Sequence, residues 1–360
     1  MADWSRRMSE PAIARRALAL AWLGCLPLST FAQSLDACRS LKADSERLAC
    51  YDALATNANN STGPTLPPSE ALSPTPVETA AGSLKAPGDE PISLLGQAWE
   101  LDAGQRGHIL RIRPYKPVYV LPWFHTTSTN TTPTSPAAGH TGTATDLSST
   151  EAKFQFSLKT KLLEDVFGSN GDLWFGYTQT SRWQVYHGGT SRPFRETNHE
   201  PEAMLLWRTD YQLGSWRGRY LSLGVNHQSN GRALPLSRSW NRVMAAVALE
   251  NDGWTLTVRP WWRIPESTSN DDNPDISNYL GRADLLLVKR WGDRQFSALL
   301  RHSLRSGENS HGAVQLDYAF PIAGSLRGHL QWFSCYGESM IDYNHRANYY
   351  GVGLSLLEWY

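Results

Sequence analysis

Cysteine, methionine, net charge and long apolar runs are all scarce in this chain of 360 residues. Four cysteines, none in a C-x-x-C pair, exclude a disulfide-built scaffold and a cysteine zinc site. Lys and Arg total 34, as do Asp and Glu, so the chain has no basic surplus with which to bind nucleic acid. Beyond the N-terminal segment no run of about 18 apolar residues occurs, which excludes spanning helices. Aromatic residues, in contrast, are abundant: the chain has 15 Trp and 14 Tyr, a composition typical of membrane β-barrels.

Residues 1–32 have the pattern of a secretion signal. A basic start is followed by an apolar stretch and by Thr30-Phe31-Ala32, a small-residue cleavage site. Because the apolar stretch is shorter than the roughly 20 residues that cross a bilayer, we expect a cleaved signal peptide, not an anchor. Residues 33–93 are expected to form a periplasmic N-terminal segment and a linker rich in Pro, Ser and Thr, and residues 94–360 the membrane domain.

Two cysteines, Cys38 and Cys50, fall in the exported N-terminal segment. A single straight helix would separate them by about 18 Å, whereas a disulfide needs Cα atoms within roughly 7 Å. The segment therefore either forms a small helical hairpin closed by a disulfide or carries two unpaired thiols in a flexible arm.

Two-residue periodicity recurs throughout residues 94–360. Leu221, Leu223 and Val225 share one face of a strand, and the tight turn at 251–253 leads into a second alternating segment. The pattern predicts an all-β fold, a transmembrane antiparallel β-barrel of twelve strands centred near residues 115, 157, 178, 206, 224, 245, 258, 283, 298, 315, 330 and 352. The alternative is a soluble β-sandwich, which the terminal aromatic pair Trp359-Tyr360 disfavours.

Charged residues on the inward rows predict a filled lumen. We expect Arg208, Asp210, Arg242, Arg259 and Glu338 to form salt bridges there. A lumen closed by paired charges argues against a porin.

A polar patch interrupts an outward apolar row in NHQSNGRALPLSRSWN, residues 226–241. His227 and Ser229 are two apart on one strand and so share a face, and Asn241 heads the outward row of the next strand, about 4.8 Å away. A serine, a histidine and an orienting amide form a nucleophile, a general base and the group that fixes its tautomer. Gly231 permits a turn that aims an amide at a developing oxyanion. The alternative is a hairpin turn with polar residues at the membrane rim.

Five stretches of the sequence stand out: NHQSNGR and SRSWNR within 226–242, YTQTSRWQ at 177–184, RPFRETNHEP at 192–201, NDDNPDI at 270–276 and YGESMIDYN at 336–344. With these motifs in this arrangement, the chain resembles the outer membrane phospholipase A family. The resemblance implies a calcium-dependent hydrolase of phospholipid and lysophospholipid acyl esters, of phospholipase A1 and A2 type. It also implies a barrel located in the outer membrane of Gram-negative bacteria and active as a homodimer. No G-x-S-x-G motif occurs, so an α/β-hydrolase is excluded.

Carried over by position, Ser229 matches the family nucleophile, His227 its base, Asn241 its orienting asparagine and Gly231 its oxyanion-hole residue. The resemblance assigns the dimer-interface calcium to the carbonyls of Arg232 and Ser237 and to the hydroxyl of Ser191 from the partner subunit. Gln179 matches an interface glutamine.

A further calcium site is less complete in this sequence. Asp272 matches a family aspartate of a site formed without dimerisation, but the second aspartate of that site falls on Leu234. Two alternatives to a phospholipase stay open, a non-catalytic outer-membrane barrel and an esterase acting on other lipids.

Overall fold

The computed structural model describes residues 42–43, 45–49 and 93–360. The predicted signal peptide, Cys38, Cys50 and nearly all of the predicted linker lie outside these residues. Within them, no helix is long and apolar enough to cross a membrane.

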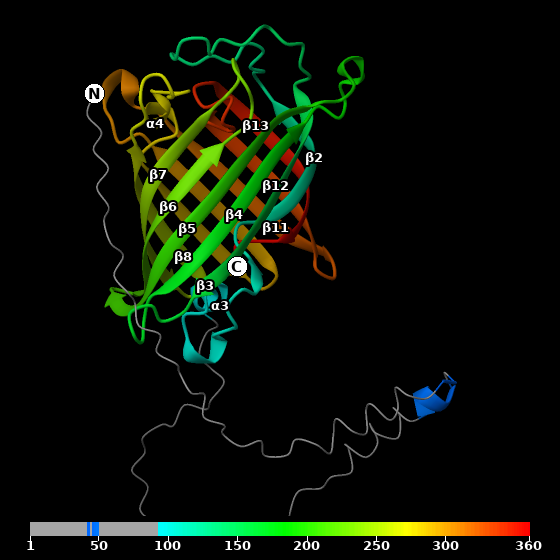
Figure 1. Ribbon diagram of the computed structural model, residues 1–360, viewed down its shortest axis with the longest axis vertical. Coiled ribbons are helices and arrows are strands. Elements are labelled where there is room, and N and C mark those ends of the chain that lie inside the picture. The colour runs from blue at the N-terminus through cyan, green and yellow to red at the C-terminus, as the bar shows by residue number, and fades with distance from the viewer. Residues whose placement is uncertain (1–41, 44, 50–92) are drawn as a thin grey trace, which may run out of the picture. The chain divides into compact units, whose positions relative to one another are not determined.

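Thirteen antiparallel strands build the domain (Figure 1). Their bounds are β1 Ile112–Pro114, β2 Val118–Thr126, β3 Thr150–Leu163, β4 Asp172–Trp183, β5 Phe194–Leu213, β6 Trp216–Ser229, β7 Ser239–Asn251, β8 Trp254–Ile264, β9 Ala283–Trp291, β10 Arg294–His302, β11 Gly312–Ala323, β12 Leu326–Tyr336 and β13 Arg346–Leu357. Two short helices accompany them, α3 (Leu94–Trp99) and α4 (Ile276–Tyr279).

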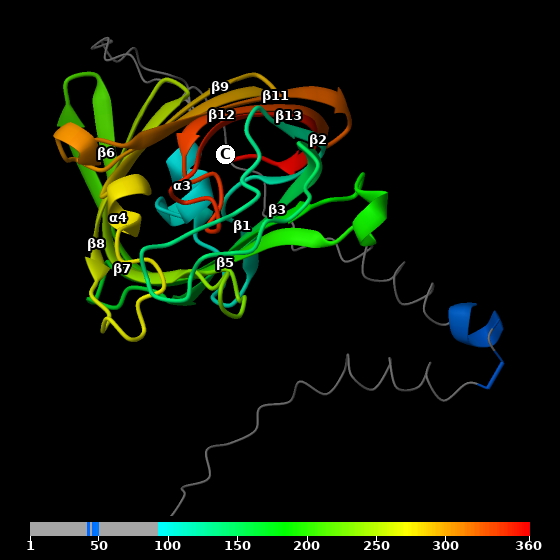
Figure 2. The same cartoon turned by 90° about the horizontal axis from the view of Figure 1, so that it is seen from above.

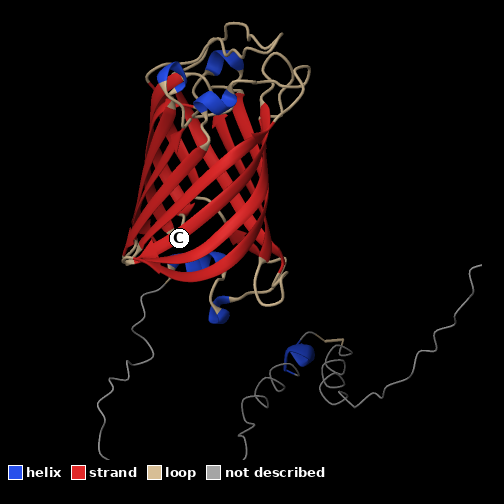
Figure 3. Ribbon diagram, turned by 90° about the vertical axis from the view of Figure 1, so that its left-hand side faces the viewer, coloured by secondary structure: helices blue, strands red, loops and turns tan. Residues whose placement is uncertain are grey.

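The sheet closes on itself. From β2 to β13 each strand pairs with the next in the chain, and β13 pairs with β2. The short β1 pairs with β3 beside the start of β2, so β1 and β2 together fill one position in the wall. The view from above shows the closed ring of strands (Figure 2), and the side view shows that they are steeply tilted, with long loops at one end and tight turns at the other (Figure 3). The predicted twelve-stranded antiparallel barrel is confirmed.

The alternation that predicted the barrel appears in the exposure of β6. Leu221, Leu223 and Val225 are 41%, 49% and 54% exposed on the outer wall, whereas Tyr220 and Asn226 are 5% and 3% exposed in the lumen. The hairpin joining β7 to β8 turns at Asp252 and Gly253, whose φ angles of 42° and 71° are those of a type I′ turn. This tight turn sets the register between β7 and β8.

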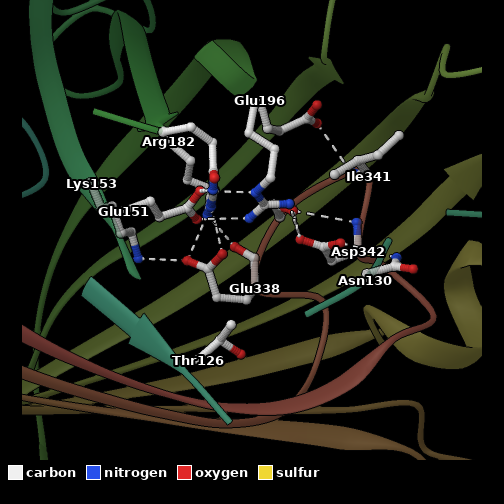
Figure 4. Close-up of polar contacts among 12 residues, drawn as sticks. Thr126, Asn130, Glu151, Lys153, Arg182, Glu196, Glu338, Ile341 and Asp342 are labelled. Atoms are coloured by element: carbon white, nitrogen blue, oxygen red, sulfur yellow. Dashed lines mark hydrogen bonds and ion pairs between the residues drawn. The ribbon is translucent and has the colours of Figure 1, made fainter. Parts of the chain in front are cut away.

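Two plugs fill the lumen. At the turn end, α3 places Leu95 and Trp99 in an apolar cluster with Trp174 and Tyr220, and the Lys159 ammonium lies 3.3 Å from the Trp99 ring centre. At the loop end, Arg182 Nη2 donates to Glu338 Oε1 over 2.7 Å, and Lys153 Nζ lies 2.8 Å from the same oxygen (Figure 4). The lumen is therefore occupied by packed apolar side chains at the turn end and by paired charges at the loop end.

The predicted inward charges are mostly confirmed. Arg242 pairs with Glu200 at 3.2 Å and Arg259 with Asp284 at 2.7 Å, all inside the barrel. The prediction was wrong for Asp210, whose side chain is 66% exposed and pairs with Arg217 at the turn end. The β5–β6 register shifts between Arg208 and Tyr211, so simple alternation no longer predicts the direction of side chains there.

Candidate active site

The predicted base and orienting amide meet on the outer wall. In the β6–β7 pair His227 lies opposite Asn241, and His227 Nδ1 is 2.8 Å from Asn241 Oδ1. An amide oxygen only accepts hydrogen bonds, so Nδ1 carries the proton and Nε2 is left as the basic nitrogen. This tautomer is the one that a base acting on a serine requires.

Ser229 shares the outer face of β6 with His227 and lies opposite Ser239 of β7. Among the described residues no hydrogen bond joins the Ser229 hydroxyl to the imidazole. Nucleophile–base contacts are often long before substrate binds and tighten in the substrate complex. The structure therefore brings the three predicted residues into one patch, with the Asn–His contact already formed.

Asn230 shapes the loop that follows Ser229. It is 4% exposed, and its Oδ1 accepts from the backbone N–H of Arg238 at 3.0 Å while its Nδ2 donates to the carbonyl of Leu236 at 2.8 Å. Asn230 thereby closes the base of the 230–238 loop. Gly231 comes next, and its φ of 61° is a conformation that glycine adopts without strain. No group in the described part of the chain accepts the Gly231 N–H, so this donor is available beside Ser229.

Glu266 extends the patch on the side away from Ser229. Asn241 Nδ2 donates to Glu266 Oε1 at 2.8 Å. Glu266 follows β8 by two residues, and Ile264 at the end of β8 lies opposite Asn241. Sequence reasoning missed Glu266, although it continues the outward row of Trp262 and Ile264.

His199 borders the patch on the other side. It lies opposite Ser229 in the β5–β6 pair and opposite Gln179 in the β4–β5 pair. The Tyr177 hydroxyl lies 2.8 Å from His199 Nδ1 and donates to Gln179 Oε1 at 3.2 Å. The predicted interface glutamine is thus tied to the residue facing the predicted nucleophile. Sequence reasoning missed His199, because its placement depends on the β5–β6 register.

The predicted calcium ligands offer oxygen atoms, as calcium prefers. Within the described residues the carbonyl of Arg232 and the hydroxyl of Ser191 accept no hydrogen bond. The Ser237 carbonyl accepts from Arg238 Nη1 at 2.7 Å and keeps a second lone pair. Ser191 is exposed on the loop between β4 and β5, as a ligand given to a partner must be. These oxygen atoms are of the kind that a calcium ion takes as ligands.

Asp272, in the loop between β8 and β9, is held by residues of two other loops. Its carboxylate lies 2.9 Å from His140 Nε2 and accepts from the Ser237 hydroxyl at 2.6 Å. Leu234, at the position of the second family aspartate, is 63% exposed. The described residues contain no cluster of three His, Cys, Asp or Glu side chains suited to a metal. Asp272 thus holds the Ser237 side chain, and Leu234 offers no carboxylate at the second family position.

The fold and the lipid-facing polar patch define an outer-membrane β-barrel with a serine–histidine–asparagine arrangement on its outer wall. The family model for phospholipase A1 matches residues 95–356. The chain belongs to this family.

Relatives and solved structures agree with this assignment. The putative phospholipase A1 of Neisseria meningitidis serogroup B is 37% identical over 92% of this chain and 93% of its own length. Among solved structures, outer membrane phospholipase A from Escherichia coli superposes with a TM-score of 0.62 at 36% identity, covering 69% of this chain and 95% of that one. The calcium-bound dimer of the Salmonella typhi enzyme gives a TM-score of 0.66 at 32% identity, covering 75% and 100%. The chain is an outer-membrane protein of the Gram-negative type.

Proposed function

We propose that this protein hydrolyses the acyl esters of phospholipids and lysophospholipids in the outer membrane, with phospholipase A1 and A2 activity. Catalysis uses Ser229, His227 and Asn241, requires calcium and is switched on by homodimer formation. The observation that carries the proposal is the 2.8 Å contact between His227 Nδ1 and Asn241 Oδ1 on a wall that faces lipid. This contact holds the imidazole in the tautomer that a base acting on a serine requires.

The reaction follows from the positions of these groups. Ser229 Oγ attacks the ester carbonyl carbon while its proton passes to His227 Nε2. The carbonyl oxygen becomes an oxyanion beside the Gly231 N–H, the free donor described above. His227 then gives its proton to the leaving glycerol oxygen as the ester bond breaks, which leaves the acyl chain on Ser229. A water molecule, deprotonated by His227, hydrolyses this acyl-enzyme, and the proton returns to Ser229 as the fatty acid leaves.

Asn241 acts on the imidazole. As Nε2 gains a proton, the ring becomes a cation whose Nδ1–H still donates to Asn241 Oδ1. The amide oxygen thus supports the cation that forms during the reaction.

Calcium and the second subunit complete the site in this proposal. The carbonyls of Arg232 and Ser237, with the hydroxyl of the partner subunit's Ser191, would hold the ion. When bound, calcium supplies positive charge that favours the developing oxyanion. Dimerisation through the wall around Gln179 is supported by the position of Gln179, whose amide lies on the outer row one strand away from His199.

The test is fatty-acid release from phospholipid micelles by the refolded protein, with calcium and with chelator. Parent protein should release fatty acid only with calcium, and Ser229→Ala should abolish release. Ser306→Ala, a change in an exposed loop serine outside the site, should leave release unchanged. Substrates labelled separately at the sn-1 and sn-2 chains report A1 and A2 activity. No release from a cross-linked parent dimer would overturn the enzyme reading in favour of a non-catalytic barrel.

A further inference from the structure

Glu266 is a partly buried carboxylate in contact with the candidate triad. Its Oε1 accepts from Asn241 Nδ2 at 2.8 Å. Within the described residues this is the only hydrogen bond or ion pair of Glu266. Its carboxylate therefore does not anchor the loop that carries it, and the contact with Asn241 needs another explanation.

The chemistry of the contact fixes the orientation of the Asn241 amide. A carboxamide has nearly the same shape when its oxygen and nitrogen exchange places, so packing alone does not choose between the two orientations. An ionised carboxylate only accepts hydrogen bonds, and so Glu266 selects the orientation with Nδ2 toward itself. The Asn241 oxygen must then face His227 Nδ1. The imidazole is thereby held as the tautomer with a free Nε2.

The charge of Glu266 adds to this effect. A serine–histidine–asparagine triad lacks the carboxylate that stabilises the imidazolium in serine–histidine–aspartate sites. Glu266 supplies a negative charge one amide away from the ring. Its carboxylate also polarises the Asn241 amide, which strengthens the acceptor that meets the His227 N–H.

We propose that Glu266 is a positioning residue for the reaction, a fourth member behind Asn241 that sets its orientation. The inference rests on the proposed hydrolase function. It concerns how the triad is held and adds no new step to the reaction.

The experiment compares Glu266→Ala and Glu266→Gln in full-length protein on phospholipid micelles with calcium. Glu266→Ala should lower kcat about 10-fold with KM within about twofold, because one charge-assisted hydrogen bond is lost from the triad and none from the lipid. Glu266→Gln keeps an acceptor oxygen for Asn241 Nδ2, but it has no charge and can also donate, so it should recover only part of the loss. Glu308→Ala and Glu308→Gln are matched controls, since Glu308 is exposed on another loop at the same end, and both should equal the parent.

A second readout is the rate at which a long-chain sulfonyl fluoride modifies Ser229. This rate depends on the base but not on release of a lipid product, and it should fall in parallel with kcat. If Glu266→Ala fails to fold, Glu266→Met takes its place, because it keeps the length of the side chain without an acceptor.

The outcomes separate this inference from the function itself. Activity that survives Ser229→Ala would overturn the proposed function. Activity that requires Ser229 but is unchanged in Glu266→Ala, or a loss that lies wholly in KM, would overturn the role of Glu266 alone. So would a Glu266→Gln variant no better than Glu266→Ala.

Discussion

His199 lies directly opposite Ser229 across the β5–β6 pair, on the outer wall of the barrel. Gln179 lies opposite His199 on the other side of β5, so the candidate interface residue and nucleophile are two strands apart, about 10 Å at the usual strand spacing. The Tyr177 hydroxyl contacts both His199 and Gln179. Any subunit that packs against Gln179 therefore reaches the edge of the catalytic patch.

Replacement of Gln179 tests whether this wall is the dimer interface. Gln179→Ala should lower activity at least about 10-fold because the proposed interface loses a polar side chain and the partner's Ser191 is no longer presented. The barrel should stay folded, since the Gln179 side chain hydrogen-bonds only to Tyr177 and Ser181 among the described residues. Activity and sedimentation in detergent are measured together. Gln212→Ala, at the turn end, is the matched control. Full activity from a demonstrated Gln179→Ala monomer would contradict this interface.

Complementation between two impaired variants tests the shared calcium site. Ser191→Ala should raise the calcium concentration needed for half-maximal activity, with Ser306→Ala as control. When equal amounts of Ser191→Ala and Ser229→Ala are mixed and pair at random, half of the dimers contain one subunit of each kind. Each mixed dimer holds one complete site, with Ser229 from one subunit and Ser191 from the other. Activity at limiting calcium should then return to roughly one quarter of the parent value. Mixtures no more active than either variant alone would argue that each subunit works independently.

Much of the barrel could be predicted because its physics is local. Alternation at every second residue places Leu223 outward and Asn226 inward whatever the partner strands are, and the lipid enforces the pattern. The inward direction predicted for Asp210 was wrong because the register shift beyond Arg208 interrupts the alternation near the turn end.

The site divides in the same way. His227 opposite Asn241 follows from strand spacing, and Glu266 was within reach of prediction, because the tight turn at 252–253 places Ile264 opposite Asn241 without a register shift. The position of His140 could not be predicted, since this residue comes from the 127–149 loop, whose path no periodicity constrains. Its contact with Asp272 depends on how two long loops pack.

The plug at the loop end is expected to dominate stability. Glu338 is 1% exposed between Arg182 and Lys153. Glu338→Ala leaves both cations without this partner, and we expect a loss of about 3–5 kcal/mol in the free energy of unfolding. Asp210→Asn, which breaks the exposed pair with Arg217, should change it little. Unfolding by denaturant in detergent, followed by tryptophan fluorescence, gives both values. Equal effects of the two substitutions would refute this role.

The same carboxyl predicts how stability depends on pH. Burial alone would raise the pKa of Glu338, but the charges of Arg182 and Lys153 outweigh it and hold the pKa below the ordinary value of 4.5. The folded state therefore binds fewer protons than the unfolded chain, and this stabilisation is complete above pH 4.5 and lost as pH falls through the folded-state pKa. Parent protein should lose stability on acidification more steeply than Glu338→Gln, in unfolding curves recorded across that range. Parallel curves would show that other groups control the acid response.

The variant Asn241→Asp tests directly whether Asn241 and Glu266 act together. An aspartate at this position still accepts from His227 Nδ1. Its second oxygen, however, replaces the Asn241 Nδ2 that donates to Glu266 Oε1 over 2.8 Å, and so faces the Glu266 carboxylate. Two like charges so close disfavour each other, so Asn241→Asp alone should be strongly impaired. Glu266→Gln in the same protein removes one charge and offers an amide donor to the new aspartate. The double variant should therefore be at least about 10-fold more active than Asn241→Asp, although Glu266→Gln alone gives no gain. Independent, additive effects on kcat in the four-protein cycle would show that the two side chains do not act as one unit.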